Sequence, residues 1–358
     1  MARVLVLGGA GFLGTHLTEH LVGLGHETSV ADNLSCPGSA ANLEWLQSRL
    51  GSKIVFHRID VRTDHSRLAR LVDSTDVLVH LVGESRCPGV ENPRAHFETN
   101  VVGAFNVLEC IRHSKRSAPA VVHVSTSRVY GRLVGVGRHT NGARTYFDDG
   151  RAGIDESTPL DFSNPSGCSQ GAADQYVLDY SRTYDLDTVV LRLSNVYGPH
   201  EYGRPTDSWP ARLTAAAISG EPAAMEGDGR RTGDYLAAED LARVVARVVE
   251  NVPVCRGEVY NVGGGPASGY SNLEMVELVE KLSGREIELK FVEAPAGEPD
   301  IYITDNTKIG RHLDWHPECS VARGISNLIR WMSRNAEAMR AMVSRPAIPA
   351  AEAVPLRA

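Results

Sequence analysis

A glycine-rich turn near the start of the chain constrains the fold more than any other sequence feature. The sequence Gly8-Gly-Ala-Gly11-Phe-Leu-Gly14 follows a short apolar run and opens a helical pattern. Gly8 permits a tight turn, Gly11 lets the backbone approach a pyrophosphate, and Gly14 lets the helix pack closely on the strand. The unpaired N–H groups of the helix N-terminus then face the phosphates. Because glycine-rich turns also occur without a ligand, the context of the motif decides its meaning.

Short runs rich in β-branched residues alternate with longer helical patterns along the first part of the chain. The predicted strands are 4–7, 27–31, 54–57, 77–81, 121–125 and 188–193, and the predicted helices are 13–24, 43–50, 66–72, 93–114 and 169–184. This alternation is typical of βαβ units that build a parallel sheet. We therefore predict an α/β fold with a Rossmann-type, doubly wound sheet, in which ligands bind at the carboxyl ends of the strands.

The regular alternation stops after Pro199, and we predict a smaller C-terminal lobe interleaved with the first domain. Residues rich in Gly and Pro read as loop through Gly233, and the elements expected after it are a helix at 239–250, a strand at 258–262, a helix at 272–282, a strand at 287–292 and a helix at 321–335. The predicted Rossmann domain is 1–195 plus 234–263, and the predicted substrate lobe is 196–233 plus 264–335. Residues 336–358 are rich in Ala and Pro, which favours a disordered tail.

Two acidic residues at the ends of predicted strands strengthen the case for a dinucleotide. Asp32 ends the second strand, where a carboxylate can accept hydrogen bonds from the hydroxyl groups of an adenosine ribose. A carboxylate there repels a 2′-phosphate, so NAD is favoured over NADP. Asp60 and Val61 follow the third strand and are placed to meet the adenine, although an ordinary turn aspartate explains Asp60 alone equally well. Taken with the glycine turn, these residues predict NAD binding.

Composition excludes several other classes of protein. The net charge of −7 and the lack of a Lys/Arg-rich run argue against a nucleic-acid partner. No apolar stretch reaches the length of a membrane-spanning helix, and the first residues do not resemble a signal peptide. The six cysteines are scattered without C-x-x-C pairs, which argues against a zinc site and a disulfide framework. We therefore expect no metal, no membrane association and a reducing, cytoplasmic setting.

Several specific strings accompany the glycine turn. They are Asp32-Asn-Leu-Ser35, Asn100-Val-Val-Gly103, Ser125-Thr-Ser-Arg-Val-Tyr-Gly131, Asn195-Val-Tyr-Gly-Pro199 and Tyr260-Asn-Val-Gly-Gly-Gly265. With them the chain resembles an extended short-chain dehydrogenase/reductase of the nucleotide-sugar epimerase/dehydratase group, from Arg3 to about Trp331. Three further strings resemble the branch of CDP-sugar 2-epimerases: Asn42-Leu-Glu-Trp45, Asp155-Glu-Ser-Thr-Pro-Leu-Asp161 and Gly167-Cys-Ser-Gln-Gly-Ala-Ala-Asp-Gln-Tyr176.

The residues and the resemblance together imply a set of cofactor contacts. The candidate NAD-binding residues are Gly8, Gly11, Phe12, Leu13, Gly14, Asp32, Asn33, Asp60, Val61, Leu81, Asn100 and Ser125. In such enzymes a Tyr takes the proton of a sugar hydroxyl while hydride passes to NAD. A Lys four residues later lowers the pKa of the Tyr, and a Ser or Thr orients the substrate oxygen.

The resemblance breaks at two of these three catalytic positions. Thr126 matches the Ser or Thr, but Ser166 stands at the Tyr position and Gln170 at the Lys position. Unaided, Ser is no general base at neutral pH, and Gln carries no charge. Losing a positioned acid or base costs roughly 10²–10⁴-fold in rate. Because the two residues keep the spacing of one helical turn, we interpret the change as substitution rather than misalignment.

Other groups are candidates for the missing proton chemistry. Glu84 and Cys87 lie in the loop after the fourth strand and can transfer protons if their pKa values are shifted. The simpler interpretation of both is a solvated loop residue. Tyr146 lies in the segment 132–153, which could fold over the site, although a surface aromatic is the better interpretation. For Cys168, we expect a buried core thiol.

The expected substrate contacts are partly lost. Asn195 matches a position that binds the nucleotide diphosphate, and Arg86 borders the substrate in this fold. The two arginines usual in the group are replaced by Gly233 and Pro295. Arg231, with Arg230 beside it, can compensate by bidentate phosphate binding, or the pair is simply solvated. The residue after Gly-Pro is His200, which we interpret as a surface histidine.

Three functions fit these features. The first is an NAD-dependent enzyme acting on a sugar or nucleotide sugar with unconventional acid/base residues. The second is a non-redox lyase or cyclase on the same scaffold, and the third is an NAD-binding pseudoenzyme that acts through a partner protein. The resemblance also implies a homodimer that pairs through the helices at 93–114 and 169–184.

Overall fold

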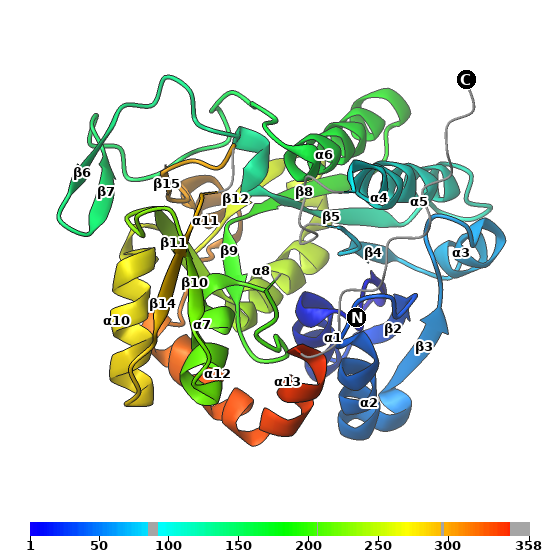
Figure 1. Cartoon of the computed structure of the whole chain (residues 1–358). Helices are drawn as coiled ribbons and strands as arrows, with labels where there is room; N and C mark the ends of the chain where they lie inside the picture. The colour runs from blue at the N-terminus through cyan, green and yellow to red at the C-terminus, as the bar shows by residue number, and fades with distance from the viewer. Residues whose placement is uncertain (85–91, 206, 295–296, 344–358) are drawn as a thin grey trace, which may run out of the picture.

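The computed structural model describes residues 1–343 except 85–91, 206 and 295–296. Its centre is a parallel sheet of seven strands in the order β12-β8-β5-β4-β1-β2-β3 (Figure 1). These strands are β1 (Arg3–Leu7), β2 (Glu27–Asp32), β3 (Ile54–Arg58), β4 (Val77–His80), β5 (Ala120–Thr126), β8 (Thr188–Leu193) and β12 (Val259–Val262). The predicted doubly wound fold is confirmed.

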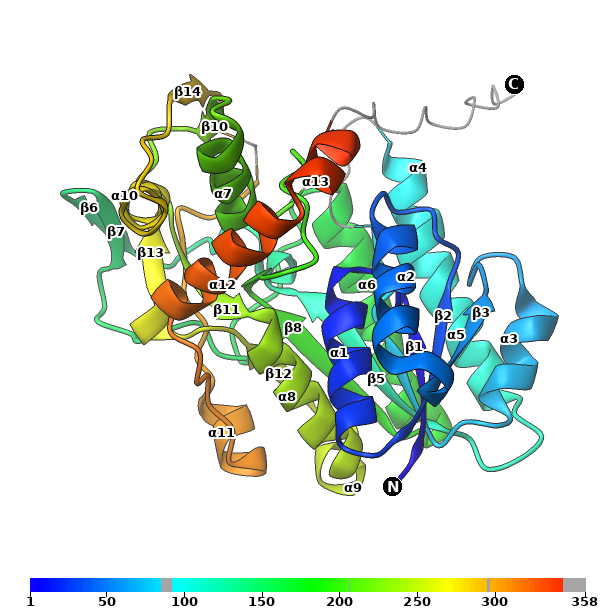
Figure 2. The same ribbon diagram turned by 90° about the horizontal axis from the view of Figure 1, so that it is seen from below.

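Helices cover both faces of the sheet, as Figure 2 shows from a second direction. The helices are α1 (Phe12–Gly23), α2 (Ser39–Leu50), α3 (His65–Val72), α4 (Pro93–His96), α5 (Gly103–Arg112), α6 (Pro165–Tyr184) and α8 (Ala238–Glu250). Apolar residues of α1 and α8 pack with Val4 and Val6 on one face, and those of α3, α5 and α6 pack with Leu5 and Leu7 on the other. Alternate residues of β1 therefore pack into two separate hydrophobic layers, one on each face of the sheet, which is why the strand is apolar after its first residue.

A second core builds the C-terminal lobe. Its strands are β9 (Asn195–Tyr197), β10 (Ala223–Glu226), β11 (Thr232–Ala237), β13 (Gly269–Ser271), β14 (Leu289–Val292) and β15 (Ile301–Tyr302), and its helices are α7 (Trp209–Ser219), α10 (Asn272–Ser283) and α12 (Val321–Arg334). Helix α11 (Thr307–Leu313) packs instead on β12 of the large sheet, where its Ile309 and Leu313 join the first core. Strand β11 pairs with β9, β13 and β15. Only Ser194 separates β8 of the large sheet from β9 of the lobe, so the chain passes directly from one core to the other.

Short elements complete the fold. The segment that could fold over the site forms a hairpin of β6 (Arg138–Asn141) and β7 (Arg144–Phe147), which projects at one edge of the molecule (Figure 1). Strand β6 is exposed, whereas β7 buries Thr145. The remaining short elements are η1 (Gly51–Lys53), η2 (Phe97–Val102), η3 (Ser127–Tyr130), α9 (Val252–Cys255) and η4 (Pro266–Ser268). Within the described part of the chain, no helix is both long and apolar enough to cross a membrane.

Two predictions about the C-terminal half are wrong. The stretch expected to be loop through Gly233 contains α7, which begins with Trp209 and Pro210 and buries most of its alanines. Proline is compatible with the first turn of a helix, so it marks a helix start here rather than a loop. The tail expected to be disordered from residue 336 instead begins with helix α13 (Ala336–Val343), which buries Met339 against the second core.

Two histidines face each other inside the large sheet. His80 of β4 and His123 of β5 are register partners with ring centroids 5.1 Å apart. Both are buried, and among the described residues neither Nδ1 atom has a hydrogen-bond partner. Burial lowers the pKa of His80 to about 3 and the pKa of His123 to about 4. Both rings are therefore neutral in the folded protein at physiological pH.

This pair makes the protein sensitive to mild acid. In the unfolded chain both histidines take up protons near the ordinary pKa of 6.5, whereas the folded chain keeps them neutral down to about pH 4. The unfolded state binds more protons in that window, so each histidine costs about 2 kcal/mol of stability by about pH 5. Thermal melting between about pH 7 and pH 5 should show this loss. His80→Leu should weaken the dependence, and His139→Gln, at an exposed histidine, should not. A melting temperature insensitive to pH would contradict the prediction.

Candidate functional site

The glycine-rich turn leaves no room for side chains between β1 and α1. Gly8 has φ +77°, and a Cβ there would lie 3.1 Å from the backbone carbon of Leu81. A Cβ on Gly14 would lie 2.3 Å from the carbonyl oxygen of Gly8. Helix α1 has Gly11 at its N-cap, without a capping side chain, and has no acidic residue in its first turn. Its N-terminal N–H groups are thus suited to an anion rather than to a side-chain cap.

Asp32 lies directly against this turn. Its Oδ2 accepts a hydrogen bond from the backbone N–H of Ala10 at 3.2 Å, and its Oδ1 accepts one from that of Leu34 at 2.8 Å. The side chain is buried, and burial raises its pKa above the ordinary value while the two backbone hydrogen bonds act the other way. Each carboxylate oxygen keeps a lone pair that a ribose hydroxyl can use. Contact of Asp32 with a ribose stays a prediction.

Asp60 and Asn33 form one hydrogen-bonded unit with Arg62. The Asp60 carboxylate accepts from Arg62 Nε at 2.9 Å, from Arg62 Nη2 at 2.7 Å and from Asn33 Nδ2 at 3.1 Å. These contacts, chiefly that with Arg62, lower the pKa of Asp60 to about 2. Val61 beside it is buried against Gly103. The carboxylate therefore orients its two neighbours, and contact of Asp60 with an adenine stays a prediction.

Asn100 connects three parts of the predicted site. It lies in η2, a π-helical turn between α4 and α5. Its Oδ1 accepts from the backbone N–H of Glu84 at 2.6 Å, and its Nδ2 donates to the Glu84 carbonyl at 3.0 Å and to Ser169 Oγ at 2.8 Å. Asn100 thereby fixes the loop after β4 to helix α6. The predicted cofactor residue has a clear structural role in the site.

Thr126 and Ser125 end β5 and have different surroundings. Thr126 Oγ1 accepts the backbone N–H of Arg128 at 3.3 Å, which leaves its own hydroxyl proton free to donate. Ser125 Oγ donates to the buried carboxylate of Asp174 at 2.9 Å, so its side chain is used within the protein. A contact of Ser125 with NAD would therefore involve its backbone.

Ser166 and Gln170 lie on the buried side of α6, near its N-terminus. The helix begins after Asn164, whose side chain accepts the backbone N–H of Gly167 at 2.8 Å, and it has Pro165 in its first turn. Ser166 Oγ and Gln170 Oε1 are buried and have no hydrogen-bond partner among the described residues. Gln170 Nε2 would lie 3.6 Å from a Cβ on Gly83, which is next to Glu84. Gln170 therefore lies against the loop that follows β4.

Of the alternative acid/base candidates, the structure describes Glu84 and Tyr146. The carboxylate of Glu84 lies near enough to Arg62 to help raise the pKa of that arginine, which places it toward the Asp60 unit. Cys87 and Arg86 lie outside the described residues. Tyr146 is exposed on the hairpin, with its ring stacked on His139 at 5.8 Å between centroids. Its predicted interpretation as a surface aromatic agrees with this position.

Two expectations about individual side chains are wrong. Cys168 is exposed rather than buried, because α6 already begins at Pro165 and turns this residue away from the sheet. His200 is buried rather than on the surface, and its Nδ1 lies 3.1 Å from Asn42 Oδ1. Its ring also packs against Trp45 and Trp331, so it joins α2 to α12. Burial lowers the pKa of His200 to about 3, which suits a structural ring.

An arginine–glutamate–arginine cluster lies between the two lobes, and the sequence did not predict it. Arg128 Nε is 3.0 Å from Glu298 Oε1, and Arg231 Nη2 is 2.5 Å from Glu298 Oε2. Arg128 comes from η3 of the first domain, whereas the other two residues come from loops of the C-terminal lobe. The two guanidinium groups lower the pKa of the largely buried Glu298 carboxyl against the effect of burial. Asn195, the other predicted substrate residue, donates from Nδ2 to the carbonyl of Asp234 at 3.1 Å.

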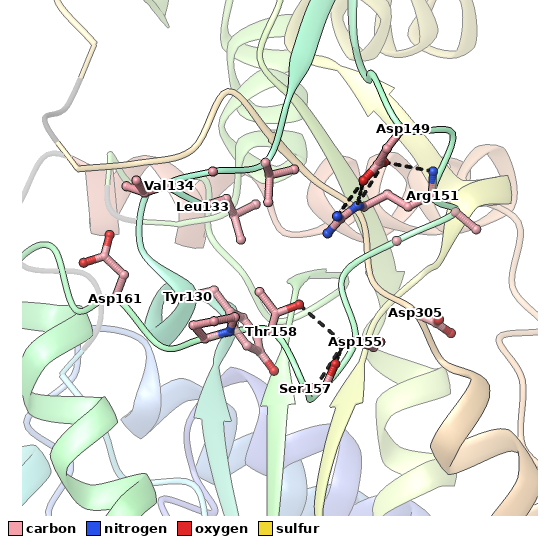
Figure 3. Close-up of a pocket in the computed structure, with 15 residues that line it drawn as sticks. Tyr130, Leu133, Val134, Asp149, Arg151, Asp155, Ser157, Thr158, Asp161 and Asp305 are labelled. Carbon is pink, nitrogen blue, oxygen red and sulfur yellow. Dashed lines mark hydrogen bonds and ion pairs between the residues drawn. The ribbon is translucent and has the colours of Figure 1, made fainter.

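A cavity of about 690 Å³ lies beside η3, on the side of the hairpin segment (Figure 3). Tyr130 and Leu133 line it, together with the carboxylates of Asp149, Asp155, Asp161 and Asp305 and the side chain of Arg151. The predicted cofactor and catalytic residues are not part of its lining. Among the residues that the structure describes, no group of three His, Cys, Asp or Glu could hold a metal ion.

Comparisons with known proteins agree with this geometry. Residues 5–328 match the family model described as GDP-mannose 4,6 dehydratase. The CDP-paratose 2-epimerase of Salmonella typhi is 34% identical, over 92% of this chain and 99% of that protein. The dTDP-glucose 4,6-dehydratase of Neisseria gonorrhoeae is 32% identical, over 93% of this chain and 96% of that protein.

Solved structures show the same fold. The UDP-glucuronic acid 4-epimerase of Bacillus cereus, in complex with UDP-glucuronic acid and NAD, superposes with a TM-score of 0.80 at 25% identity, over 93% of this chain and 99% of that one. A dTDP-glucose 4,6-dehydratase of Streptomyces venezuelae with NAD bound gives a TM-score of 0.82 at 28% identity, over 95% of this chain and 99% of that one.

Proposed function

Because this chain belongs to the nucleotide-sugar epimerase/dehydratase family of extended short-chain dehydrogenase/reductases, we propose that it is an NAD-binding enzyme that acts on a sugar or sugar-derived metabolite with non-standard acid/base residues. One observation carries the proposal. The glycine turn and Asp32 keep the form of a dinucleotide site, and the resemblance of the sequence implies that Ser166 and Gln170 replace the Tyr and Lys of the family.

The described residues fit NAD. The turn from Gly8 to Gly14 and the uncapped start of α1 would hold the pyrophosphate, and Asp32 would accept the hydroxyls of the adenosine ribose. Asn33 and Val61 would border the adenine. When bound, NAD supplies a hydride acceptor and donor. The buried amide of Gln170 can hydrogen-bond the cofactor or substrate, but it supplies no positive charge to stabilise a tyrosinate.

Neither Thr126 nor Ser166 can remove the proton of a substrate hydroxyl unaided. Because Thr126 Oγ1 accepts from Arg128, the threonine hydroxyl can donate to a substrate oxygen and hold it in place. Ser166 Oγ can accept or donate a hydrogen bond, yet a serine hydroxyl does not remove a proton at neutral pH without a base beside it. The proton of a substrate hydroxyl must therefore pass to another group. Glu84 and Cys87 stay our candidates for that group, with the position of the Glu84 carboxylate near Arg62 counting against it.

The first experiment is to purify the protein without added ligand, denature it and identify the released molecules by mass spectrometry. We expect NAD, with a fraction of NADH or a sugar nucleotide if the chemistry is redox. Absorbance of NADH during mixing with UDP-, dTDP- and CDP-sugars then tests hydride transfer directly. A protein that carries no NAD and does not bind added NAD would refute the proposal and favour a non-redox enzyme or a pseudoenzyme.

Restoring the family residues should not restore ordinary chemistry. We expect the double variant Ser166→Tyr, Gln170→Lys to form NADH no faster than the wild type with the same panel of nucleotide sugars, because the resemblance implies that two substrate-binding arginines have also been replaced, by Gly233 and Pro295. The control is Cys168→Ser on the exposed side of the same helix, which should behave as the wild type. A gain of about 10²-fold or more in the double variant would identify the protein as an ordinary epimerase that has lost its catalytic pair.

We further propose a homodimer that pairs through α5 and α6. Phe105 of α5 and Tyr176 of α6 are both exposed, and their rings meet edge to face with centroids 6.1 Å apart. Exposed aromatic groups at one place on a helical face favour a protein interface. Light scattering should give about twice the chain mass of 38.7 kDa. Phe105→Glu should give a monomer, and Phe291→Glu, at an exposed residue of β14, should not. A monomeric wild type would refute this proposal.

A further inference from the structure

We propose that His96 accepts the proton of the substrate hydroxyl, and that Ser166 passes this proton from the substrate to His96. The inference rests on the proposed function, because it names the base that the same site uses in place of the tyrosine that the resemblance implies. Three features of the described residues support it. They are the tautomer of His96, its position beside Ser166, and a polar atom on each of these side chains that the protein itself leaves unused.

A backbone carbonyl fixes the tautomer of His96. The residue ends the short helix α4, and its ring is fully buried. Its Nδ1 lies 2.8 Å from the carbonyl oxygen of Glu84. A carbonyl oxygen only accepts hydrogen bonds, so Nδ1 must carry a proton and donate it. In the neutral ring the lone pair is then on Nε2, which is buried and has no hydrogen-bond partner among the described residues. The ring is thus held in the form in which Nε2 can take up a proton.

The position of His96 beside Ser166 follows from the way α6 packs against α4 and α5. The strands that follow α5 and α6 are parallel, and the apolar residues of both helices join one layer, so the helices run side by side in the same direction (Figure 1). The hydrogen bond from Asn100 Nδ2 to Ser169 Oγ, 2.8 Å long, sets their register. His96 lies about one helical turn before Asn100, and Ser166 lies about one turn before Ser169. The two residues are therefore neighbours where α4 contacts α6.

A continuous chain of hydrogen bonds holds the two residues in this arrangement. The Glu84 carbonyl that accepts from His96 also accepts from Asn100 Nδ2 at 3.0 Å. The same Nδ2 donates to Ser169 Oγ, and that hydroxyl donates to the backbone carbonyl of Ser166 at 3.2 Å. The backbone of Ser166 is thus tied to the ring of His96 through neutral groups that do not take up the proton themselves.

Ser166 Oγ is the second unused atom. The residue is 6% exposed, and its hydroxyl has no hydrogen-bond partner among the described residues. A serine hydroxyl becomes a proton-transfer group when a histidine beside it takes its proton. Such a base must come within reach directly or through one water molecule, and the contact often tightens only when the substrate binds.

The proposed step balances in protons and electrons. The substrate hydroxyl gives its proton to Ser166 Oγ while the proton of Ser166 passes to His96 Nε2. The carbon that carried the hydroxyl loses its hydride to NAD and becomes a carbonyl carbon. The products are a keto sugar, NADH and an imidazolium ring, and the reverse transfers restore the neutral histidine.

The variant His96→Asn tests the two ring nitrogens separately. The asparagine amide can keep a hydrogen bond to the Glu84 carbonyl, but it has no basic atom in place of Nε2. We follow NADH absorbance in a single turnover after mixing the full-length, NAD-loaded protein with UDP-glucose, dTDP-glucose or CDP-glucose. We expect hydride transfer at least about 10²-fold slower than in the wild type, with unchanged NAD content and melting temperature. The control His113→Asn, at an exposed histidine that follows α5, should keep the wild-type rate.

A second variant tests the passage of the proton through Ser166. Ser166→Ala should also slow hydride transfer, and the double variant Ser166→Ala, His96→Asn should be no slower than the slower single variant. Residues that act as one unit show such non-additive losses. Losses that multiply in the double variant would overturn the proposal.

The tautomer of His96 can be measured without any variant, so this measurement decides if His96→Asn fails to fold. Long-range ¹H–¹⁵N NMR spectra of histidine-labelled protein should show a proton on Nδ1 and none on Nε2. The opposite tautomer would overturn the proposal. So would a folded His96→Asn variant with the wild-type rate, or no NADH with any of the three sugars. NAD released from the same samples by denaturation separates the two failures. A protein that contains NAD but fails these tests loses only the assignment of His96, whereas a protein without NAD also fails the proposed function.

Discussion

Replacing Arg192 with methionine should lower the free energy of unfolding by about 3–5 kcal/mol. Arg192 of β8 and Asp174 of α6 form an ion pair that is almost fully buried. Nε donates to Oδ2 at 2.8 Å and Nη2 donates to Oδ1 at 2.9 Å, while Nη1 donates to Tyr130 Oη at 3.0 Å. Removing the guanidinium group would leave a carboxylate inside the protein with only neutral partners, Ser125 Oγ and Gln175 Nε2.

Urea unfolding followed by circular dichroism measures this loss. The control is Arg3→Met, because Arg3 pairs with Asp76 at the surface, where such pairs contribute less than about 1 kcal/mol. The double variant Asp174→Leu, Arg192→Met should be more stable than Arg192→Met alone, since it removes both buried charges. If Arg192→Met unfolds at the same urea concentration as the wild type, water or another group must compensate the charge of Asp174.

The second large effect is expected at Gly14. Alanine there should weaken NAD binding by at least about tenfold and also lower stability, because its Cβ would lie 2.3 Å from the Gly8 carbonyl oxygen and 2.5 Å from the Gly9 Cα. Both are backbone atoms, which cannot avoid the clash by a side-chain rotation. Helix α1 would have to move away from β1, and its N-terminal N–H groups would leave the phosphate position.

The same helix supplies a matched control. Gly23, near the end of α1, has no atom within 4 Å of the place where a Cβ would stand. Gly23→Ala should therefore keep NAD affinity and leave stability unchanged or slightly higher. Titration with NAD and a melting curve for both variants give the comparison. Wild-type NAD affinity in Gly14→Ala would show that the close approach of α1 to β1 is not what places the cofactor.

The first half of the fold was predictable because its signals are local. The apolar strands, the glycine turn and Asp32 lie within short stretches, and the structure places them as expected. The spacing of Ser166 and Gln170 likewise predicted that both lie on the same side of one helix. In the structure both lie on the inward side of α6.

The errors come from features that tertiary packing decides. Helix α7 was missed because its proline and small residues look like a loop until their burial against α10 and α12 is known. The predicted helix began at residue 169 and left Cys168 outside it, whereas α6 begins at Pro165 and presents Cys168 to solvent. The cluster of Arg128, Glu298 and Arg231 joins three separate segments of the two lobes, so no local pattern could indicate it.

The way α6 is anchored bears on how this site could change in evolution. The helix is fixed by the Asn164 cap and by Ala173, Val177 and Leu178, which are buried further along it. Among the residues that the structure describes, Ser166 Oγ and Gln170 Oε1 have no hydrogen-bond partner that would help to hold the helix in place. Substitutions at these two positions that fit the available space therefore break no hydrogen bond on which the helix depends, and the proton-transfer residues can change one at a time. New chemistry could arise at these two positions on α6, because the glycine turn that holds the cofactor lies elsewhere in the chain, between β1 and α1.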